Sequence, residues 1–311
     1  MKSSYIAVGY RCNHKCVMCP LSNRERNDIP IPYASMISHI ESEGFSAGDH
    51  ITLSGGEPTL CEYLLDLLEY LMNRKIRVTL LTNSSGFADR TKAVKLARIT
   101  DSSRFNVVTA LHSADPAVHD EITQTPGSFQ QSVSGLKNLS DAGVNITVKH
   151  ILNAKTYKGL AEYADMIIRN FPPSAEIQFT SIDISGNALK NASELLTGFK
   201  EMQSDLEKAL QILTEECRIP YRISLIEMPL CACSPKYWKY YRQMEKSLDS
   251  YIAPNTLNDR GVVRNMQNEC LPVYLECGRC DVRCFCPGAW HSSYTLMKDG
   301  LLRPIRCSVK E

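Results

Sequence analysis

The sequence of 311 residues lacks the features that mark several large classes of protein. No run of about 18 apolar residues occurs, and residues 1–11 lack the apolar core and cleavage site of a secretory signal. We therefore expect a cytoplasmic protein without a membrane partner. Net charge is almost absent, because 35 Lys and Arg residues balance 34 Asp and Glu residues. Nucleic acid is not expected as the main partner, since phosphate binding relies on an excess of positive charge.

Internal repeats and low-complexity tracts are also absent, while 43% of the residues are hydrophobic and 22% are charged. These fractions are ordinary for globular proteins and argue against a disordered, collagen-like or coiled-coil chain. Cysteine, in contrast, is abundant, with 13 residues. In a reducing compartment, such cysteines more often bind metal or carry out redox chemistry than form disulfides. We interpret the isolated Cys61 and Cys217 as packing residues.

The first group of cysteines follows an apolar stretch at residues 5–8 and contains Cys12, Cys16 and Cys19. Three thiolates so close in sequence converge only if the backbone curls into a loop, which Asn13, His14 and Pro20 favour. An iron–sulfur cluster held by three cysteines keeps one iron open for a small molecule. A zinc site that uses the three cysteines and His14 is the alternative.

A second motif begins with an apolar strand at residues 51–54, which leads into Gly55, Gly56, Glu57 and Pro58. Glycines let a ligand approach the backbone, and a carboxylate at this place can hold an ammonium group. A Gly-Gly-Glu sequence by itself is more often a turn than a site. Together with the cysteine group upstream, it indicates a binding site.

The spacing Cys-x3-Cys-x2-Cys and the Gly-Gly-Glu-Pro segment together resemble the radical S-adenosylmethionine (SAM) superfamily. In that family, three cysteines hold a four-iron four-sulfur (4Fe-4S) cluster, whose fourth iron binds the amino and carboxylate groups of SAM. The resemblance implies that the cluster ligands are Cys12, Cys16 and Cys19. It also implies that the methionine end of SAM is lined by Gly55, Gly56 and Glu57.

Strand and helix alternate along the chain, which is typical of a parallel α/β sheet. Apolar strands are predicted at residues 5–8, 50–53, 77–81, 105–111, 144–151 and 176–179, and helices such as 62–73 and 128–142 lie between them. Six such units fit an open, partial (β/α)6 radical SAM barrel. The sequence therefore predicts an α/β protein with three parts: the barrel at residues 1–190, a linking helix and strand at 191–230, and a smaller cysteine-rich extension at 231–311.

Other candidate SAM contacts come from single residues. Met18 stands where the family often has an aromatic residue near the adenine, and its polarizable sulfur can pack on a ring. In parallel α/β folds, ligands lie beyond the carboxyl ends of the strands. The resemblance implies that Asn83, Ser113 and Asn153, which follow three predicted strands, approach the ribose or carboxylate of SAM. Caps and turns are the alternative role for these three residues.

The chain changes in character after Gly186. Residues 193–217 predict one long amphipathic helix, and residues 218–228 predict a strand. Residues 236–242 mix basic and aromatic side chains, a pattern that could stack on nucleobases or grip a peptide. An amphipathic helix with its aromatic side chains packed inward is favoured for this segment.

The C-terminal cysteines lie too close together for core packing, with five of them at Cys270, Cys277, Cys280, Cys284 and Cys286. A structural zinc site would use four of them and stays open as an alternative. The pattern Cys277-x2-Cys280-x5-Cys286-x-Gly288 resembles the SPASM or twitch extension of radical SAM enzymes, which carries auxiliary 4Fe-4S clusters. The full SPASM pattern has a further cysteine where this chain has Trp290, so one auxiliary cluster is favoured over two.

The fourth ligand of that auxiliary cluster has two candidates. Cys231 stands in a Pro-x-Cys context that matches many single-cluster relatives, and Cys307 lies at the distance that SPASM proteins use. Cys231 is slightly favoured, and Cys307 comes next. Cys233, Cys270 and Cys284 are unassigned, and they would supply thiolates for a second auxiliary cluster.

The resemblance implies an oxidoreductase in which one electron from the first cluster cleaves SAM. The resulting 5′-deoxyadenosyl radical then abstracts a substrate hydrogen, and an external reductant of the flavodoxin or ferredoxin type supplies the electron. SPASM or twitch extensions are most frequent in enzymes that crosslink, epimerise or oxidise peptides and proteins. The predicted substrate is therefore a ribosomally made peptide.

Two further expectations concern recognition and alternative functions. Cys12 lies too near the N-terminus for a fused leader-recognition domain ahead of the barrel, so recognition falls to a separate protein or to the barrel and extension themselves. The enzymatic alternative is a dehydrogenase or epimerase of a small molecule or carbohydrate. The non-enzymatic alternative is an iron–sulfur or zinc protein that serves structure or redox sensing, which would not need Gly55, Gly56 and Glu57.

Overall fold

The computed structural model describes residues 2–21, 30–241, 252–253, 264–265, 270–271, 274–297 and 300–306. Its main feature is a curved parallel sheet, in which strands that follow one another in sequence lie side by side. The strands are β1 (Ser3–Ala7), β2 (His50–Ser54), β3 (Arg77–Leu81), β4 (Phe105–Ala110), β5 (Ile146–Leu152), β6 (Glu176–Ser181) and β7 (Arg222–Ile226). The predicted α/β fold with a parallel sheet is confirmed.

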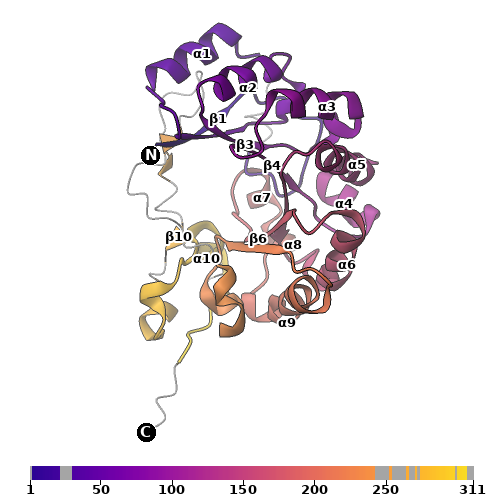
Figure 1. Cartoon of the computed structure of the whole chain (residues 1–311). Coiled ribbons are helices and arrows are strands. Elements are labelled where there is room, and N and C mark those ends of the chain that lie inside the picture. Colours follow the sequence, from indigo (N-terminus) through magenta and orange to yellow (C-terminus); the bar gives the residue numbers. More distant parts are fainter. Residues whose placement is uncertain are drawn as a thin grey trace.

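Helices cover the outer side of the curved sheet (Figure 1). They are α1 (Tyr33–Ser42), α2 (Leu64–Asn73), α3 (Arg90–Ile99), α4 (Pro116–Thr123), α5 (Ser128–Asp141), α6 (Leu160–Asn170) and α9 (Phe199–Gln211). Each parallel connection needs such a crossover helix. In α2, for example, Leu64, Leu67, Leu68 and Leu71 recur at helical spacing and are buried. The main hydrophobic core lies between these helices and the sheet.

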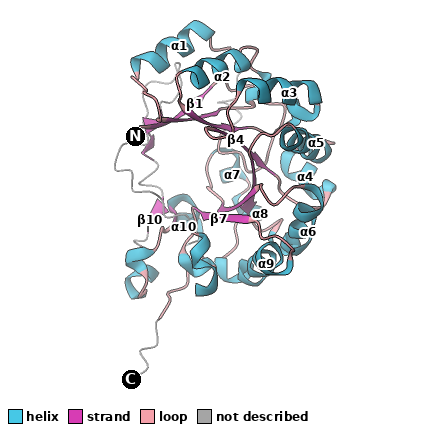
Figure 2. Ribbon diagram, in the orientation of Figure 1, coloured by secondary structure: helices cyan, strands magenta, loops and turns pink. Residues whose placement is uncertain are grey.

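The sheet continues beyond the six predicted units at both edges. β7 comes from the segment that follows the predicted barrel, and it pairs in parallel with β6. At the other edge, β8 (Ile252–Ala253) pairs in parallel with β1, and β9 (Arg264–Asn265) pairs antiparallel with β8. Figure 2 shows the arc of strands from β1 to β7, with α1, α2, α3, α5, α6 and α9 on its convex side.

The prediction of one helix over residues 193–217 is wrong. The segment forms α8 (Ala192–Leu195), α9 and a π-helical turn at Ile212–Glu216. The break lies at Gly198, whose backbone is extended at φ −74° and ψ 155°. The Phe199 N–H donates to the Leu301 C=O at 3.3 Å, and a Cβ at Gly198 would lie 2.4 Å from the Gly300 carbonyl oxygen. The C-terminal segment therefore packs at the break, a contact that helical periodicity cannot reveal.

The C-terminal part consists of short elements. They are the 3-10 helices η5 (Leu230–Ala232), η6 (Pro235–Tyr240), η8 (Glu276–Arg279) and η9 (Arg283–Phe285), the antiparallel pair β10 (Cys270–Leu271) and β11 (Ala289–Trp290), and α10 (His291–Met297). In η6, Tyr237 is buried and its hydroxyl donates to the Glu207 C=O at 3.1 Å, so this aromatic side chain packs inward as predicted. Cys61 and Cys217 pack against the main core, which confirms their interpretation. No helix in the described ranges is long and apolar enough to cross a bilayer.

Candidate functional site

The first group of cysteines lies in the loop at residues 8–21, termed the cysteine loop, which follows β1 at the carboxyl end of the parallel strands. Ligands bind at this end in parallel α/β folds. The Lys15 N–H donates to the Thr123 C=O in α4 at 2.9 Å, and the Val17 N–H donates to the Ile122 C=O at 2.9 Å. From α7 (Gly186–Lys190), the Asn187 N–H donates to the Cys19 C=O at 2.9 Å. Two helices thus fasten the loop in place.

Three half-buried thiols, those of Cys12, Cys16 and Cys19, are the candidate ligands on this loop. The His14 N–H donates to the Cys12 sulfur at 3.4 Å. Within the described part of the chain, no three Cys, His, Asp or Glu side chains converge closely enough to bind one metal ion. An iron–sulfur cluster places each thiolate on a different iron, so it needs a wider spacing than a zinc ion, with its Zn–S bonds of about 2.3 Å. Three thiols on one loop are the donor set that a 4Fe-4S cluster with one open iron would use.

The Gly-Gly-Glu segment lies directly against the cysteine loop. The Gly56 N–H donates to the Gly9 C=O at 2.8 Å, and the Glu57 N–H donates to the Arg11 C=O at 2.8 Å. A Cβ at Gly55 would lie 2.1 Å from the Gly9 oxygen, and one at Gly56 would lie 2.2 Å from the Arg11 oxygen. Gly55 also has a φ of +119°, which strains any residue with a side chain. Both glycines are needed for the two motifs to meet.

The carboxylate of Glu57 is buried and lies among hydrogen-bond donors. Its Oε1 accepts bonds from the Thr59 N–H, the Thr59 hydroxyl and the Thr82 hydroxyl, at 2.9, 2.7 and 2.5 Å. Its Oε2 accepts the Asn83 N–H at 2.7 Å. Burial raises the pKa of Glu57, and these hydrogen bonds oppose that rise. A cationic ammonium group beside Oε2 would stabilise the charged carboxylate further.

The predicted SAM contact Asn83 uses its side chain to reach the cysteine loop. Its Nδ2 donates to Asn13 Oδ1 at 2.8 Å, and its Oδ1 accepts the Ser85 hydroxyl at 2.7 Å. The Asn13 Nδ2 donates to the Ser85 hydroxyl at 2.8 Å, so the three side chains form a closed ring of hydrogen bonds. Sequence reasoning missed Asn13 and Ser85 in this role, because only the fold brings the two loops together.

The remaining predicted SAM contacts lie in varied surroundings. Met18, within the cysteine loop, is buried in a small apolar cluster with Ile122 and Ile184. Ser113 accepts the Asp115 N–H at 3.0 Å. Asn153 is buried, and its Nδ2 donates to the Ile151 C=O at 2.8 Å. The hydrogen bonds of Ser113 and Asn153 are local ones of the kind found in caps and turns, which was the alternative role for these residues.

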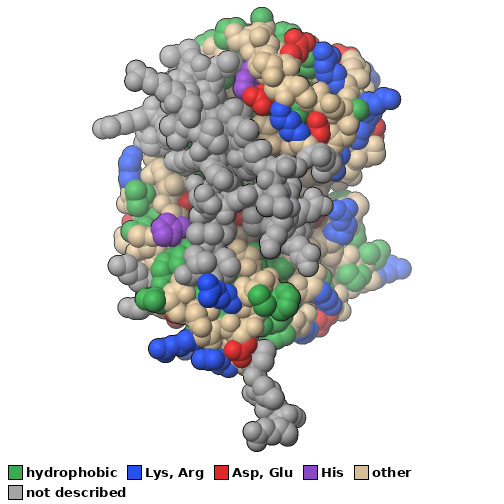
Figure 3. Space-filling model, turned by 90° about the vertical axis from the view of Figure 1, so that its left-hand side faces the viewer, with side chains coloured by type: hydrophobic (Ala, Val, Ile, Leu, Met, Phe, Trp, Pro, Cys, Tyr) green, Lys and Arg blue, Asp and Glu red, His purple; other side chains and the backbone are tan. Residues whose placement is uncertain are grey.

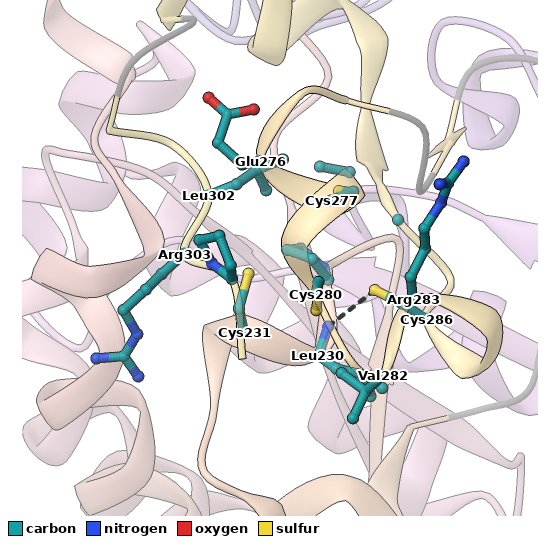
Figure 4. Close-up of a pocket in the computed structure, with 14 residues that line it drawn as sticks. Leu230, Cys231, Glu276, Cys277, Cys280, Val282, Arg283, Cys286, Leu302 and Arg303 are labelled. Carbon is teal, nitrogen blue, oxygen red and sulfur yellow. Dashed lines mark hydrogen bonds between the residues drawn. The ribbon is translucent and has the colours of Figure 1, made fainter. Parts of the chain in front are cut away.

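The second group of cysteines surrounds one cavity of about 370 Å³ that includes some open solvent. Its lining includes Cys231, Cys277, Cys280 and Cys286 (Figure 4). Cys231 belongs to η5, a few residues after β7, whereas the other three lie on and beside η8 and η9. The fold thus brings Cys231, which follows β7 closely, to three cysteines about 50 residues later in the chain.

These thiols affect one another electrostatically. Burial raises the pKa of Cys231 to about 12, and negative charge on Cys286, Cys277 and Cys280 contributes to the rise. Burial also raises the pKa of Cys277 and Cys286. The Leu230 N–H donates to the Cys286 sulfur at 3.3 Å, which favours its thiolate. Binding an iron–sulfur core would require these groups as thiolates, and the cationic core would offset their mutual repulsion.

The other C-terminal cysteines differ from these four. Cys233 is buried in the main core, where its side chain hydrogen-bonds with Tyr241 and burial raises its pKa to about 12. Cys284 is exposed. Neither is among the described residues that line the cavity. Cys307, the second candidate for the fourth ligand, lies outside the described residues, and Cys270 is described only by its backbone in β10.

A group of buried histidines also escaped sequence reasoning. The His119 Nδ1 accepts the His112 N–H at 3.2 Å, and the His150 Nε2 contacts the His112 C=O at 3.1 Å. Burial lowers the pKa of His150 to about 3 and that of His119 to about 4, so both rings are neutral at physiological pH. The single sequence signal was the position of His112 directly after a predicted strand.

Comparisons with known proteins agree with this architecture. A family profile described as "Radical SAM superfamily" matches residues 6–167 of the chain. A "Probable GTP 3',8-cyclase" from Sulfolobus acidocaldarius is 26% identical over 174 residues, which cover 55% of this chain and 52% of that protein. "Mycofactocin maturase MftC" from Mycolicibacterium smegmatis is 25% identical over 178 residues, which cover 57% of this chain and 43% of that protein. The chain thus spans about half the length of these curated relatives.

A solved structure shows the same fold. The crystal structure of SuiB from Streptococcus suis, bound to its precursor peptide SuiA, matches with a TM-score of 0.56 and 17% identity. The match covers 72% of this chain and 48% of SuiB. At this level of identity, the likeness concerns the arrangement of strands and helices.

Proposed function

This chain belongs to the radical SAM superfamily, and we propose that it modifies a ribosomally made peptide with the help of one auxiliary 4Fe-4S cluster. The first cluster would be held by Cys12, Cys16 and Cys19. The auxiliary cluster would be held by Cys231, Cys277, Cys280 and Cys286. When bound, the first cluster and SAM supply the radical that abstracts a hydrogen atom from the substrate.

The observation that carries the proposal is the convergence of four thiols on one cavity. Four cysteines can bind all four irons of a cluster, whereas the three in the cysteine loop leave one iron open. An auxiliary cluster without an open iron can exchange electrons but cannot chelate a substrate. Electron transfer is therefore favoured over substrate binding as the role of this cluster.

The protein itself supplies positioning and closure. Gly55 and Gly56 bring the backbone of the second motif against the cysteine loop, and Glu57 offers Oε2 to the amino group of SAM. The extension packs on the segment after β6: the Ser292 hydroxyl donates to Asp183 Oδ1 at 2.7 Å, and the Ser293 hydroxyl donates to the Ile182 C=O at 2.7 Å. These contacts hold α10 against the segment that follows β6, a placement that would help to exclude water from radical chemistry.

The peptide substrate is supported by the relatives rather than by a cavity of the right shape. The name of MftC describes a maturase, and SuiB was solved with a precursor peptide. We propose a peptide or protein substrate for this chain by analogy. An external flavodoxin- or ferredoxin-type reductant and a separate leader-recognition protein are part of the same proposal.

A nucleotide is the second candidate substrate. The relative from Sulfolobus acidocaldarius is named a GTP 3',8-cyclase, and it matches a share of this chain similar to that matched by MftC. A small-molecule substrate, the alternative that the sequence left open, is therefore tested alongside the peptide.

The cofactor part is tested by the iron and sulfide content of the anaerobically reconstituted protein. We expect about eight irons per chain, and about four in a variant in which Cys12, Cys16 and Cys19 are all alanine. A parent with only about four irons, all lost in that variant, would refute the auxiliary cluster. Zinc bound in their place would support the structural alternative.

The substrate part is tested by incubating the reduced protein and SAM with peptides encoded beside its gene and, separately, with GTP. We expect a peptide to change in mass and to raise the formation of 5′-deoxyadenosine, while GTP does neither. The opposite result would favour the nucleotide.

A further inference from the structure

The two most exposed large hydrophobic side chains of the described residues flank the second cysteine site. Leu275 is 89% exposed and Phe285 is 81% exposed, whereas the next, Ile219, is 57% exposed. Leu275 directly precedes η8, and Phe285 directly precedes Cys286. A single exposed apolar side chain is ordinary, but here two of them directly adjoin, in sequence, residues that line one cavity.

Positive charge accompanies these side chains. Arg279 in η8 and Arg283 in η9 are both exposed. The acidic groups nearby are engaged, since Glu276 accepts the Tyr294 hydroxyl at 2.9 Å and Asp281 lies 3.5 Å from the Arg306 guanidinium. The described residues from 274 onward contain four arginines and two acids, in a chain with a net charge of only +1.

Two arginines lie around the cavity of the second cysteine site. Figure 4 shows Arg283 and Arg303 on opposite sides of the cysteines, with both guanidinium groups pointing away from the cavity. On the face in Figure 3, Lys and Arg side chains lie near hydrophobic ones at the lower end of the molecule. Cys277, Cys280 and Cys286 are only half-buried, so a cluster bound to them would lie near the surface.

We propose that Leu275, Arg279, Arg283 and Phe285, termed the auxiliary face, dock an acidic one-electron carrier protein. The inference rests on the proposed function, because it needs the auxiliary cluster. Apolar side chains beside arginines are typical of binding hot spots, and positive charge favours a partner with an acidic surface. Phe285 directly precedes the candidate ligand Cys286, so a partner that contacts Phe285 would be close to the cluster. In the direction tested, the reduced carrier loses one electron, the oxidised cluster gains it, and no bond forms or breaks.

The experiment measures how fast a reduced flavodoxin with an acidic surface reduces the reconstituted holoenzyme under anaerobic conditions. The charge variant combines Arg279→Glu and Arg283→Glu, and the apolar variant is Phe285→Ala. Matched controls are Arg98→Glu, at an exposed position of α3, and Ile219→Ala, at an exposed apolar position. Dithionite serves as a small reductant that needs no docking. A chain with Cys12, Cys16 and Cys19 replaced by alanine isolates reduction of the auxiliary cluster.

We expect the charge variant to slow reduction by flavodoxin about tenfold at low salt, with a smaller difference at high salt. Phe285→Ala should slow reduction several-fold at both salt concentrations. Both controls should match the parent, and dithionite should reduce all variants equally, with the same iron content. The slowing should persist in the chain that retains only the auxiliary cluster.

Equal rates for all variants, with about eight irons in each, would overturn the docking site and leave the proposed function intact. A parent with only about four irons would instead refute the auxiliary cluster and, with it, this inference. Unchanged flavodoxin rates together with loss of peptide binding in the variants would assign the face to the substrate. If the rates of reduction by flavodoxin are unchanged but the parent is a dimer and the variants are monomers, the auxiliary face would be assigned to contact with a second copy of this chain.

Discussion

The Asn83 side chain donates a hydrogen bond from Nδ2 to Oδ1 of Asn13 at 2.8 Å, and this contact joins the loop after β3 to the cysteine loop. Asn13 stands directly after the candidate ligand Cys12. Through its own N–H, Asn83 also binds Glu57 of the second motif. The cysteine loop, the Gly-Gly-Glu segment and the loop after β3 therefore form one connected network.

Asn13→Ala is expected to loosen the cysteine loop, because it removes the hydrogen bonds to both Asn83 and Ser85. The bonds lie at the surface, so the free energy of unfolding should fall by only about 1 kcal/mol. Iron release from the first cluster to a chelator should become several-fold faster. Asn106→Ala, which removes one bond to Thr147 in the sheet, is the matched control and should release iron at the parental rate. Equal release from both variants would contradict this role for Asn13.

Gly56→Ala is expected to damage the site directly. Its Cβ would meet the Arg11 oxygen at 2.2 Å and the Tyr10 oxygen at 2.5 Å, so the two loops must move apart. We expect a loss of stability of about 1–3 kcal/mol by chemical denaturation, and loss of SAM binding. Gly159→Ala is the control, because nothing lies within 4 Å of its added Cβ and its φ is −93°. That variant should stay within about 0.5 kcal/mol of the parent.

Cys231→Ala and Cys233→Ala should separate a ligand from a packing residue two positions away. Cys231 lines the cavity of the second cysteine site, whereas Cys233 lies in the main core beside Tyr241. The first substitution should lower the iron content from about eight to about four, and the second should leave it at about eight. If Cys231→Ala keeps all of its iron, Cys307 becomes the better candidate.

Stability should fall in acid because of the buried histidines. Burial lowers the pKa of His150 from 6.5 to about 3, so below pH 6.5 the unfolded chain binds a proton that the folded chain does not. The free energy of unfolding should therefore decrease as the pH falls from 6.5 towards 3, by about 1.4 kcal/mol per pH unit for this group.

The pH effect is checked by denaturant titrations of the metal-free chain between pH 7 and pH 5. His150→Gln keeps an N–H donor but cannot titrate, so its slope against pH should be smaller by about one proton. Phe179→Leu removes a ring that packs against His150, and it should lower stability without changing the slope. An unchanged slope in His150→Gln would show that other groups cause the acid sensitivity.

Much of the fold could be read from the sequence, because its signals are local. Alternating apolar strands and amphipathic helices predicted the parallel sheet, since each periodicity reflects the face that an element buries. The prediction of one helix over residues 193–217 was wrong. At the break, Phe199 contacts Leu301, which lies about 100 residues further along the chain. Local periodicity carries no information about such a contact.

The sequence by itself determined the family, because the spacing of Cys12, Cys16 and Cys19 and the Gly-Gly-Glu segment are local patterns that can be read along the chain. Only the tertiary structure decided which distant groups join them. It brings Cys231 to the cavity of the extension, and it surrounds the Glu57 carboxylate with donors from Thr59, Thr82 and Asn83. These contacts depend on how strands pack side by side, and residues far apart in the chain become neighbours only after the sheet has formed.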